Sequence, residues 1–326
     1  MDKEELREML NKDLADEHAS IIRYLIHAYQ VGDDTPFGNM LLTTAREEMW
    51  HMDWLGDEIG ERGWEPDMVK GPYPYDGTSN ASLLRSYIEW EENLVEVYEE
   101  QAAQVDDPEL KRILLQLGWE SVTHRRRFAY WLEKLGPEGE EPLEFEPSDF
   151  SEAFSRRLDG EVDEHYKLVL QHLRHAFVFE EDSCPVGSEL ELTAMRHMKH
   201  MSYFAEELAE RGHELEFEFP GIDLSDMVDA ALDADLELTD GTRERLAFLG
   251  HLPEMGEHDD LKLEVENMVT RDGMLIALLK GLEEEAEEAA EAPDAIEAPP
   301  VEQDQPEDDA SDTPSDTFTV GTLIEK

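Results

Sequence analysis

Apolar residues recur every three or four positions along four long segments of the first 135 residues, which is the spacing of one face of an α-helix. The predicted helices cover about residues 4–30, 39–62, 82–105 and 109–135, and stretches rich in Gly, Pro and Asp separate them. The shared face of the first helix carries Leu6, Leu10, Leu14, Ile21, Leu25 and Ala28. Four helices of this length are the components of an antiparallel four-helix bundle.

The hydrophobic pattern and part of the local sequence then occur a second time. Residues 161–178 resemble 13–30 at an offset of 148 positions, and residues 195–214 resemble 46–65 at an offset of 149. Because the two offsets agree within one residue, we predict an internal duplication.

Two further helical patterns, at about 224–249 and 259–282, complete the second set of four. They are much less similar to their counterparts in the first set. The sequence therefore predicts an all-α fold of two tandem four-helix bundles, in residues 1–140 and 150–285.

The helical pattern stops near residue 283, where Glu, Ala, Asp and Pro become dominant. Residues 286–316 contain too few apolar side chains to offset the entropy of ordering, so we predict a disordered acidic linker. The chain nevertheless ends on an apolar segment, residues 317–326. An apolar segment beyond a disordered linker indicates a binding peptide.

Acidic residues outnumber basic ones by 82 to 27, and the net charge of −55 is spread along the whole chain. This composition is typical of proteins from salt-accumulating halophiles, whose high ionic strength screens the repulsion. It disfavours nucleic acids and anionic membranes as partners and favours cations.

The single cysteine, Cys184, excludes an intrachain disulfide framework and a cysteine-based rubredoxin site. The chain opens on polar and acidic residues rather than a signal peptide, and no apolar run is long enough to cross a membrane. We therefore expect a cytoplasmic protein.

Acids and histidines recur on the inward faces of the first four predicted helices. Helices two and four carry Glu-His pairs three or four residues apart, which places both side chains on one face. In a chain with 82 acids one such pair is common by chance, and only the joint pattern is informative. Carboxylates can bridge two iron ions, and imidazoles fill terminal positions. The candidate residues are Glu17, Glu48, His51, Glu91, Glu120 and His124.

These segments resemble the ferritin-like di-iron superfamily. LADEHASIIRYLIHA and TAREEMWHMDWLGDEI are similar to the first two helices of bacterioferritins and rubrerythrins, and residues 87–124 are similar to the last two helices of short rubrerythrin-like proteins. The resemblance covers about residues 5–135 well and 160–215 weakly. It implies a di-iron centre whose ligands are Glu17, Glu48, His51, Glu91 and His124, with Glu48 as a bridge.

The fourth helix departs from the family pattern, which would place a glutamate at Ser121. Here the acid stands one residue earlier, at Glu120, still within about 40° of His124 around the helix. We expect Glu120 to complete the centre with altered geometry. Tyr24, seven residues after Glu17, joins the candidate catalytic set, and Tyr98 stands at the same distance from Glu91.

The resemblance also raises haem as a second candidate cofactor. Met49 stands where bacterioferritins have their haem-ligating methionine. A methionine on a helix face more often serves packing alone, which is the alternative.

In the second copy, histidines replace the metal-centre residues. His165 replaces Glu17, His172 replaces Tyr24, and His197 and His200 replace Glu48 and His51. A His-rich site for zinc, copper or iron is one interpretation. A degenerate copy with hydrogen-bonded histidines is the other, because no bridging carboxylate is evident and Arg271 aligns with His124.

The C-terminal sequence Thr-Val-Gly-Thr-Leu-Ile resembles the targeting peptides of encapsulin cargo proteins, which dock inside a protein nanocompartment. The resemblance implies that Val320, Leu323 and Ile324 fill apolar pockets of a shell protein and that Gly321 lets the backbone turn. A random apolar terminus is the alternative.

These features predict an encapsulated ferroxidase, a cytoplasmic protein inside a nanocompartment, that oxidises Fe(II) with O2 or peroxide. A rubrerythrin-like peroxidase and a non-catalytic metal-binding cargo or adaptor are the alternatives. A homo-oligomer is compatible with the sequence.

Overall fold

The computed structural model describes residues 1–73, 78–145, 148–179 and 186–291. In these ranges it contains eight α-helices, two short 3₁₀ helices and no strand, so the predicted all-α fold is confirmed. The α-helices are α1 (Lys3–Val31), α2 (Pro36–Gly60), α3 (Asn80–Gln104), α4 (Pro108–Leu135), α5 (Glu152–Val178), α6 (Val186–Ala209), α7 (Val228–Leu249) and α8 (Asp259–Glu291). The 3₁₀ helices are η1 (Gly136–Glu140) and η2 (Pro253–Glu257).

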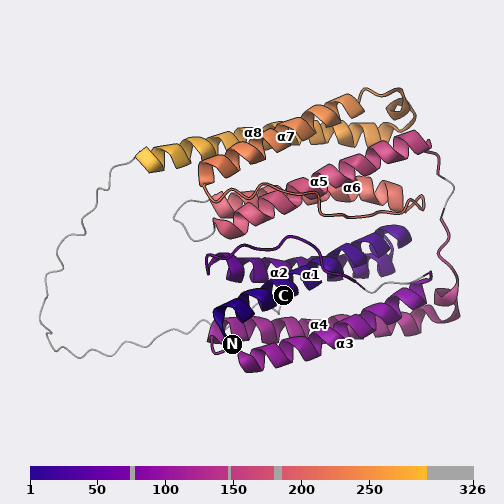
Figure 1. The fold of residues 1–326 in the computed structure, drawn as a ribbon. Coiled ribbons are helices and arrows are strands. Elements are labelled where there is room, and N and C mark those ends of the chain that lie inside the picture. Colours follow the sequence, from indigo (N-terminus) through magenta and orange to yellow (C-terminus); the bar gives the residue numbers. More distant parts are fainter. Residues whose placement is uncertain (74–77, 146–147, 180–185, 292–326) are drawn as a thin grey trace, which may run out of the picture. The chain divides into compact units, whose positions relative to one another are not determined.

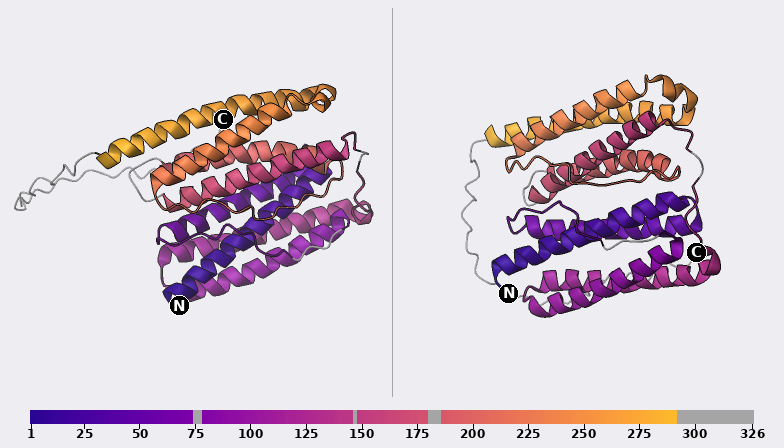
Figure 2. Two further views of the ribbon diagram at one scale, coloured as in Figure 1. Left: turned by 45° about the horizontal axis from the view of Figure 1, so that its top comes forward. Right: turned by 45° about the vertical axis from the view of Figure 1, so that its right-hand side comes forward.

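The helices pair as neighbours along the chain and stack in layers (Figures 1 and 2). The order of the layers is α3/α4, α1/α2, α5/α6 and α7/α8, so the α1/α2 and α5/α6 pairs lie together in the middle. Met1–Ala289 forms one compact unit. We call α1–α4 the N-terminal half and α5–α8 the C-terminal half. The predicted linker, residues 286–316, lies largely outside the described residues, and the predicted targeting peptide, residues 317–326, lies wholly outside them.

Side-chain caps explain where several helices begin. The Asp2 carboxylate accepts hydrogen bonds from the backbone N–H groups of Glu4 and Glu5 at the start of α1. At the start of α4, the Asp107 carboxylate accepts hydrogen bonds from the backbone N–H groups of Glu109 and Leu110. Pro108 has no N–H, but the first turn of a helix has no intrahelical acceptor for one. These caps satisfy backbone donors that have no partner within the helix.

The two halves approach each other closely where α2 meets the C-terminal end of α5. A β-carbon added at Gly56 would lie 2.5 Å from the ring of Phe177, and one added at Gly60 would lie 1.8 Å from the Phe177 carbonyl oxygen. Elsewhere between the halves, the Tyr29 hydroxyl donates to the Ser202 hydroxyl at 2.7 Å and so joins α1 to α6. The glycines therefore permit a separation that no larger residue would allow.

One continuous apolar core runs through both halves, and buried polar side chains lie near the middle of the helices. These polar groups include the residues singled out from the sequence. Among the described residues, no helix combines the length and the apolar composition that a bilayer span requires.

Candidate metal centres

Four helices of the N-terminal half bring five predicted residues together. Glu17 comes from α1, Glu48 and His51 from α2, Glu91 from α3 and His124 from α4, and all five are fully buried. They form two overlapping groups, Glu17–Glu48–His51 and Glu48–Glu91–His124, and within each group the potential ligand atoms lie within 4.8 Å of one another. Glu48 belongs to both groups and occupies the middle of the centre. The structure thus contains buried Glu and His groups that could hold metal ions.

The Glu48 carboxylate lies between the two imidazoles. One oxygen is 2.7 Å from Nδ1 of His51, and the other is 2.9 Å from Nδ1 of His124. Glu17 lies 3.4 Å from the same nitrogen of His51, and Glu91 lies 3.6 Å from that of His124. Both Nδ1 atoms therefore point inward, each towards two carboxylates.

Two tyrosines hold the outer carboxylates in place across the centre. The Tyr24 hydroxyl donates to Glu91 at 2.5 Å, and the Tyr98 hydroxyl donates to Glu17. Each tyrosine thus bonds the glutamate of the other helix rather than the one seven residues before it. The sequence placed both tyrosines at the centre but did not reveal this crossed pairing.

The outward nitrogens of the two imidazoles also meet acids. Nε2 of His51 lies 2.8 Å from Glu120, and Nε2 of His124 lies 2.9 Å from Glu47, which Arg127 also contacts. Such outer carboxylates fix the orientation and tautomer of a ligating imidazole. Glu120 is thus placed behind His51, and its role as a metal ligand stays a prediction.

The spacing along the chain explains the position of Glu120. It lies 73 residues after Glu47, and the same offset relates His51 to His124 and Glu48 to Ser121. Glu120 is therefore the counterpart of the outer acid Glu47, whereas Ser121 is the counterpart of Glu48. The Ser121 hydroxyl is buried and has no hydrogen-bond partner in the part of the chain that the structure describes. Sequence reasoning missed Glu47, because an acid next to Glu48 is not distinctive in so acidic a chain.

Electrostatics in the N-terminal half favour protons on the imidazoles when no metal is bound. Burial opposes charge on His51, but Glu48 and Glu17 outweigh it and raise the His51 pKa well above its usual value. Glu48 and Glu91 raise the pKa of His124 in the same way despite its burial. Burial, followed by repulsion from Glu48, raises the pKa of Glu17 to about 8. Metal ions would therefore replace protons at this centre.

A surface hollow of about 470 Å³ leads towards the centre between α2 and α4. Buried His124 is part of its lining, together with the outer acids Glu47 and Glu120 and the indoles of Trp50 and Trp54. Both outer acids are about one-third exposed. Arg127, which pairs with Glu47, also lines the hollow, so two acids and one base stand beside the buried His124.

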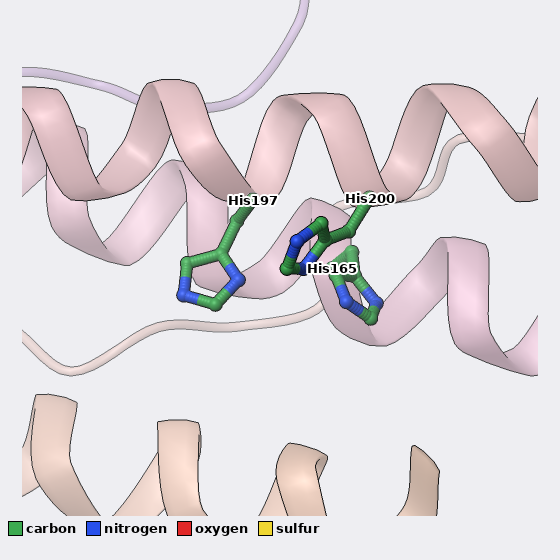
Figure 3. A group of neighbouring side chains, drawn as sticks. All are labelled: His165, His197 and His200. Carbon is green, nitrogen blue, oxygen red and sulfur yellow. The ribbon is translucent and has the colours of Figure 1, made fainter. Parts of the chain in front are cut away.

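In the C-terminal half, the three predicted histidines also come together. His165 of α5 and His197 and His200 of α6 are buried, and their potential ligand atoms lie within 4.8 Å of one another (Figure 3). His172 stacks on His197 with ring centroids 5.4 Å apart. The acid that sequence reasoning did not assign to this group is Asp272 of α8, which neighbours His200.

A separate cavity of about 340 Å³ lies between the α1/α2 and α5/α6 pairs. Met49 and Met198 both line it, and they are 149 residues apart, as His51 and His200 are. Most of the remaining lining is apolar, and Arg46 is the main cationic contribution from α2. The cavity thus has related methionines on its two sides.

The chain matches no protein-family model, no curated protein and no solved structure. Its candidate function is therefore argued from the two centres and the sequence.

Proposed function

We propose that the N-terminal half is a ferritin-like ferroxidase centre that binds two Fe(II) ions as substrate. The observation that carries this proposal is Glu48, a fully buried carboxylate shared by two groups that each add one further glutamate and one histidine. Carboxylates are hard ligands that can bridge two cations, and imidazoles suit iron at terminal positions. The tandem ferritin-like arrangement of the two halves is part of the same proposal.

The reaction transfers one electron from each of two Fe(II) ions to an oxidant. O2 with two protons would give hydrogen peroxide, whereas peroxide with two protons would give water. The chain's part is to position the ions. Tyr24 and Tyr98 hold the outer glutamates, Glu120 and Glu47 orient the imidazoles, and burial excludes bulk water.

Replacement of Glu48 tests the centre. Glu48→Ala should abolish two-iron stoichiometry and Fe(II) oxidation while leaving the helix content largely intact, because the shared ligand is lost. Glu58→Ala is the matched control, since Glu58 is a buried acid of α2 that pairs with Arg62 away from the centre. If the Glu48→Ala protein still bound two irons and oxidised them at the parent rate, the assignment would be wrong.

Two alternative functions give different results in the same assay. A rubrerythrin-like peroxidase would turn over peroxide with an external reductant, although the single cysteine supplies no rubredoxin donor. A non-catalytic metal-binding cargo or adaptor would bind metal, one ion per centre, without oxidising it. The shared position of Glu48 favours two ions, and the strongly acidic composition favours cation capture.

Haem is a second candidate cofactor, favoured by Met49 and Met198 on opposite sides of one largely apolar cavity. Bound haem would supply electron-transfer chemistry. The residues that would hold it are the two thioethers, with Arg46 and Lys199 as cationic partners in the lining. Titration of the protein with haemin should give a saturable Soret band that Met49→Ala with Met198→Ala removes and that Met255→Ala, a buried methionine elsewhere, does not.

We further propose that the protein is a cargo of an encapsulin shell. The similarity of residues 319–324 to cargo-targeting peptides supports this, together with their position after an acidic linker. The shell would then hold the Fe(III) mineral that the centre produces.

A further inference from the structure

The three histidines of the C-terminal half form a compact buried cluster on α5 and α6 (Figure 3). The ring centroids of His165 and His200 are 5.4 Å apart, and those of His165 and His197 are 5.8 Å apart. His197 and His200 follow each other at i, i+3 on α6, so one helix presents both towards α5. The cluster therefore joins two helices through nitrogen donors.

The ring nitrogens of this cluster have unused lone pairs. Nδ1 of His165 lies 2.9 Å from the Glu161 carbonyl oxygen, to which it donates, so Nε2 is the unprotonated nitrogen. Nε2 of His165, both nitrogens of His197 and Nδ1 of His200 have no hydrogen-bond partner among the described residues. A buried polar atom without a partner is unfavourable by about 1–3 kcal/mol, so several of them together indicate a missing ligand.

The charge of this cluster differs from that of the N-terminal centre. Burial lowers the pKa of His165 to about 4 and that of His200 to about 3, so these imidazoles are neutral near pH 7. Neutral imidazole is the form that coordinates metals. A centre built mainly from neutral nitrogen donors favours zinc and other late divalent transition metals, whereas the carboxylate-rich centre of the other half favours iron.

Asp272 is the carboxyl group beside these histidines, and burial raises its pKa to about 7, so a bound metal ion would displace its proton. Asp272 is fully buried on α8, and neither carboxylate oxygen has a hydrogen-bond partner among the described residues. One oxygen lies 3.4 Å from Nδ1 of His200. Zinc–ligand bonds of about 2.0–2.1 Å in a tetrahedron place neighbouring ligand atoms about 3.3 Å apart, which agrees with this separation.

Asp272 also has the right position in the duplicated sequence. It lies 148 residues after His124, the offset that relates His165 to Glu17. Arg271, which the sequence alignment paired with His124, lies one residue short of this offset, so Asp272 is the better counterpart of His124. In the structure, Arg271 instead pairs with Glu264 on α8, with more than half of its side chain exposed.

We propose that the C-terminal half holds one zinc-type divalent metal ion through His165, His197, His200 and Asp272. Four protein ligands leave no open position, so the ion is structural and ties α5 and α6 to α8. The two halves thus use one scaffold for different metals. This site does not depend on the ferroxidase proposal, because none of its ligands belongs to the N-terminal centre.

Metal titration of the full-length protein tests the site. The chelator-treated protein should bind one Co²⁺ with the intense visible absorption of tetrahedral coordination, and Zn²⁺ should displace it. His197→Gln and Asp272→Asn should each weaken this binding by at least about tenfold. His27→Gln, at a buried histidine of α1 that bonds Asn80, should leave it unchanged. Zinc should raise the melting temperature of the Glu48→Ala protein, which lacks the shared ligand of the N-terminal centre, but not that of a protein that carries both Glu48→Ala and His197→Gln.

The outcomes separate this site from the N-terminal centre. Glu48→Ala should keep the tetrahedral Co²⁺ signal, and loss of the signal in that variant but not in His197→Gln would overturn the proposal. Absence of tight Co²⁺ and Zn²⁺ binding by the parent would also overturn it, as would a parent-like tetrahedral Co²⁺ signal in His197→Gln. His165→Gln provides a second variant if His197→Gln fails to fold, which circular dichroism of the metal-free proteins would show.

Discussion

Each imidazole of the N-terminal centre lies between inner carboxylates and one outer acid. Although burial opposes it, the negative charge of these carboxylates raises the pKa values of His51 and His124 above their usual value. Burial and repulsion from Glu48 raise the pKa of Glu17 to about 8. All three groups therefore hold protons near neutral pH in the metal-free protein, and ligation must release them.

This predicts that metal affinity of the N-terminal centre rises with pH between about 6 and 8, because fewer protons must then be displaced. Calorimetric titrations with Zn²⁺ or Co²⁺ in buffers of different ionisation enthalpy would measure the released protons. Binding at the C-terminal site should release fewer protons, because burial keeps His165 and His200 neutral and Asp272, whose pKa is raised to about 7, is the protonated group there. Affinity that does not change with pH, in a His197→Gln background that isolates the N-terminal centre, would contradict the prediction.

We predict different effects on iron binding for substitutions at the neighbouring positions 120 and 121. Glu120→Ala should weaken iron binding by about 10- to 100-fold, because His51 loses the acid that orients it. Ser121→Ala should be nearly silent, since the Ser121 hydroxyl makes no hydrogen bond with any described residue. Glu47→Ala is the matched comparison and should resemble Glu120→Ala, because Glu47 contacts His124 equivalently. If neither Glu120→Ala nor Glu47→Ala weakened iron binding, the outer acids would contribute nothing to it.

At the scale of helices, the close contact of α2 with α5 depends on two glycines. Gly60→Ala should lower the melting temperature markedly, because its β-carbon would overlap a backbone oxygen of Phe177 that cannot move independently. Overpacking of this kind lowers the free energy of unfolding by about 1–3 kcal/mol or more.

Gly160→Ala in α5 is the control for this substitution. It meets nothing within 4 Å and should stabilise the protein slightly, because alanine is the better helix former. Thermal unfolding followed by circular dichroism would measure both. If the Gly60→Ala protein were as stable as the Gly160→Ala protein, α2 and α5 could move apart without a loss of stability, and the prediction would be wrong.

Much of the helical architecture could be predicted because its signals are local. The apolar period and the Gly and Pro breaks predicted a helix over 109–135, and α4 is Pro108–Leu135. The five buried residues of the N-terminal centre followed from the same periodicity. The place of Glu120 did not, because one residue turns a side chain by about 100° and only the packing of α2 against α4 decides which imidazole nitrogen it meets. Asp272 was missed for a similar reason, since its partners lie on another helix.

At the scale of the whole molecule, the net charge of −55 acts on every partner the protein meets. It attracts cations, among them the proposed substrate Fe(II), and repels anionic surfaces. High salt screens both effects, so iron uptake should be fastest at the lowest salt that keeps the protein folded. Initial oxidation rates measured across a salt series would test this, and a Glu47→Gln variant should show a weaker salt dependence.

The last prediction concerns the C-terminal peptide, which lies outside the described residues and is argued from sequence. Val320, Leu323 and Ile324 would each contribute about 1.5–3 kcal/mol on full burial, and ordering the peptide would offset a good part of it. One contact would therefore be weak to moderate, which is sufficient when a closed shell prevents escape after assembly. Deletion of residues 317–326 should leave Fe(II) oxidation unchanged and abolish co-purification with a co-expressed shell protein.

Fusion of the same residues to an unrelated protein should direct that protein into the shell, and a fusion with Leu323→Asp should not enter, because a charge cannot be buried in an apolar pocket without a partner. Encapsulation that persists after the deletion, or a fusion that stays outside, would refute targeting by this peptide. Neither result would affect the ferroxidase centre, because its ligands all lie within α1–α4 and oxidation is measured on the free protein.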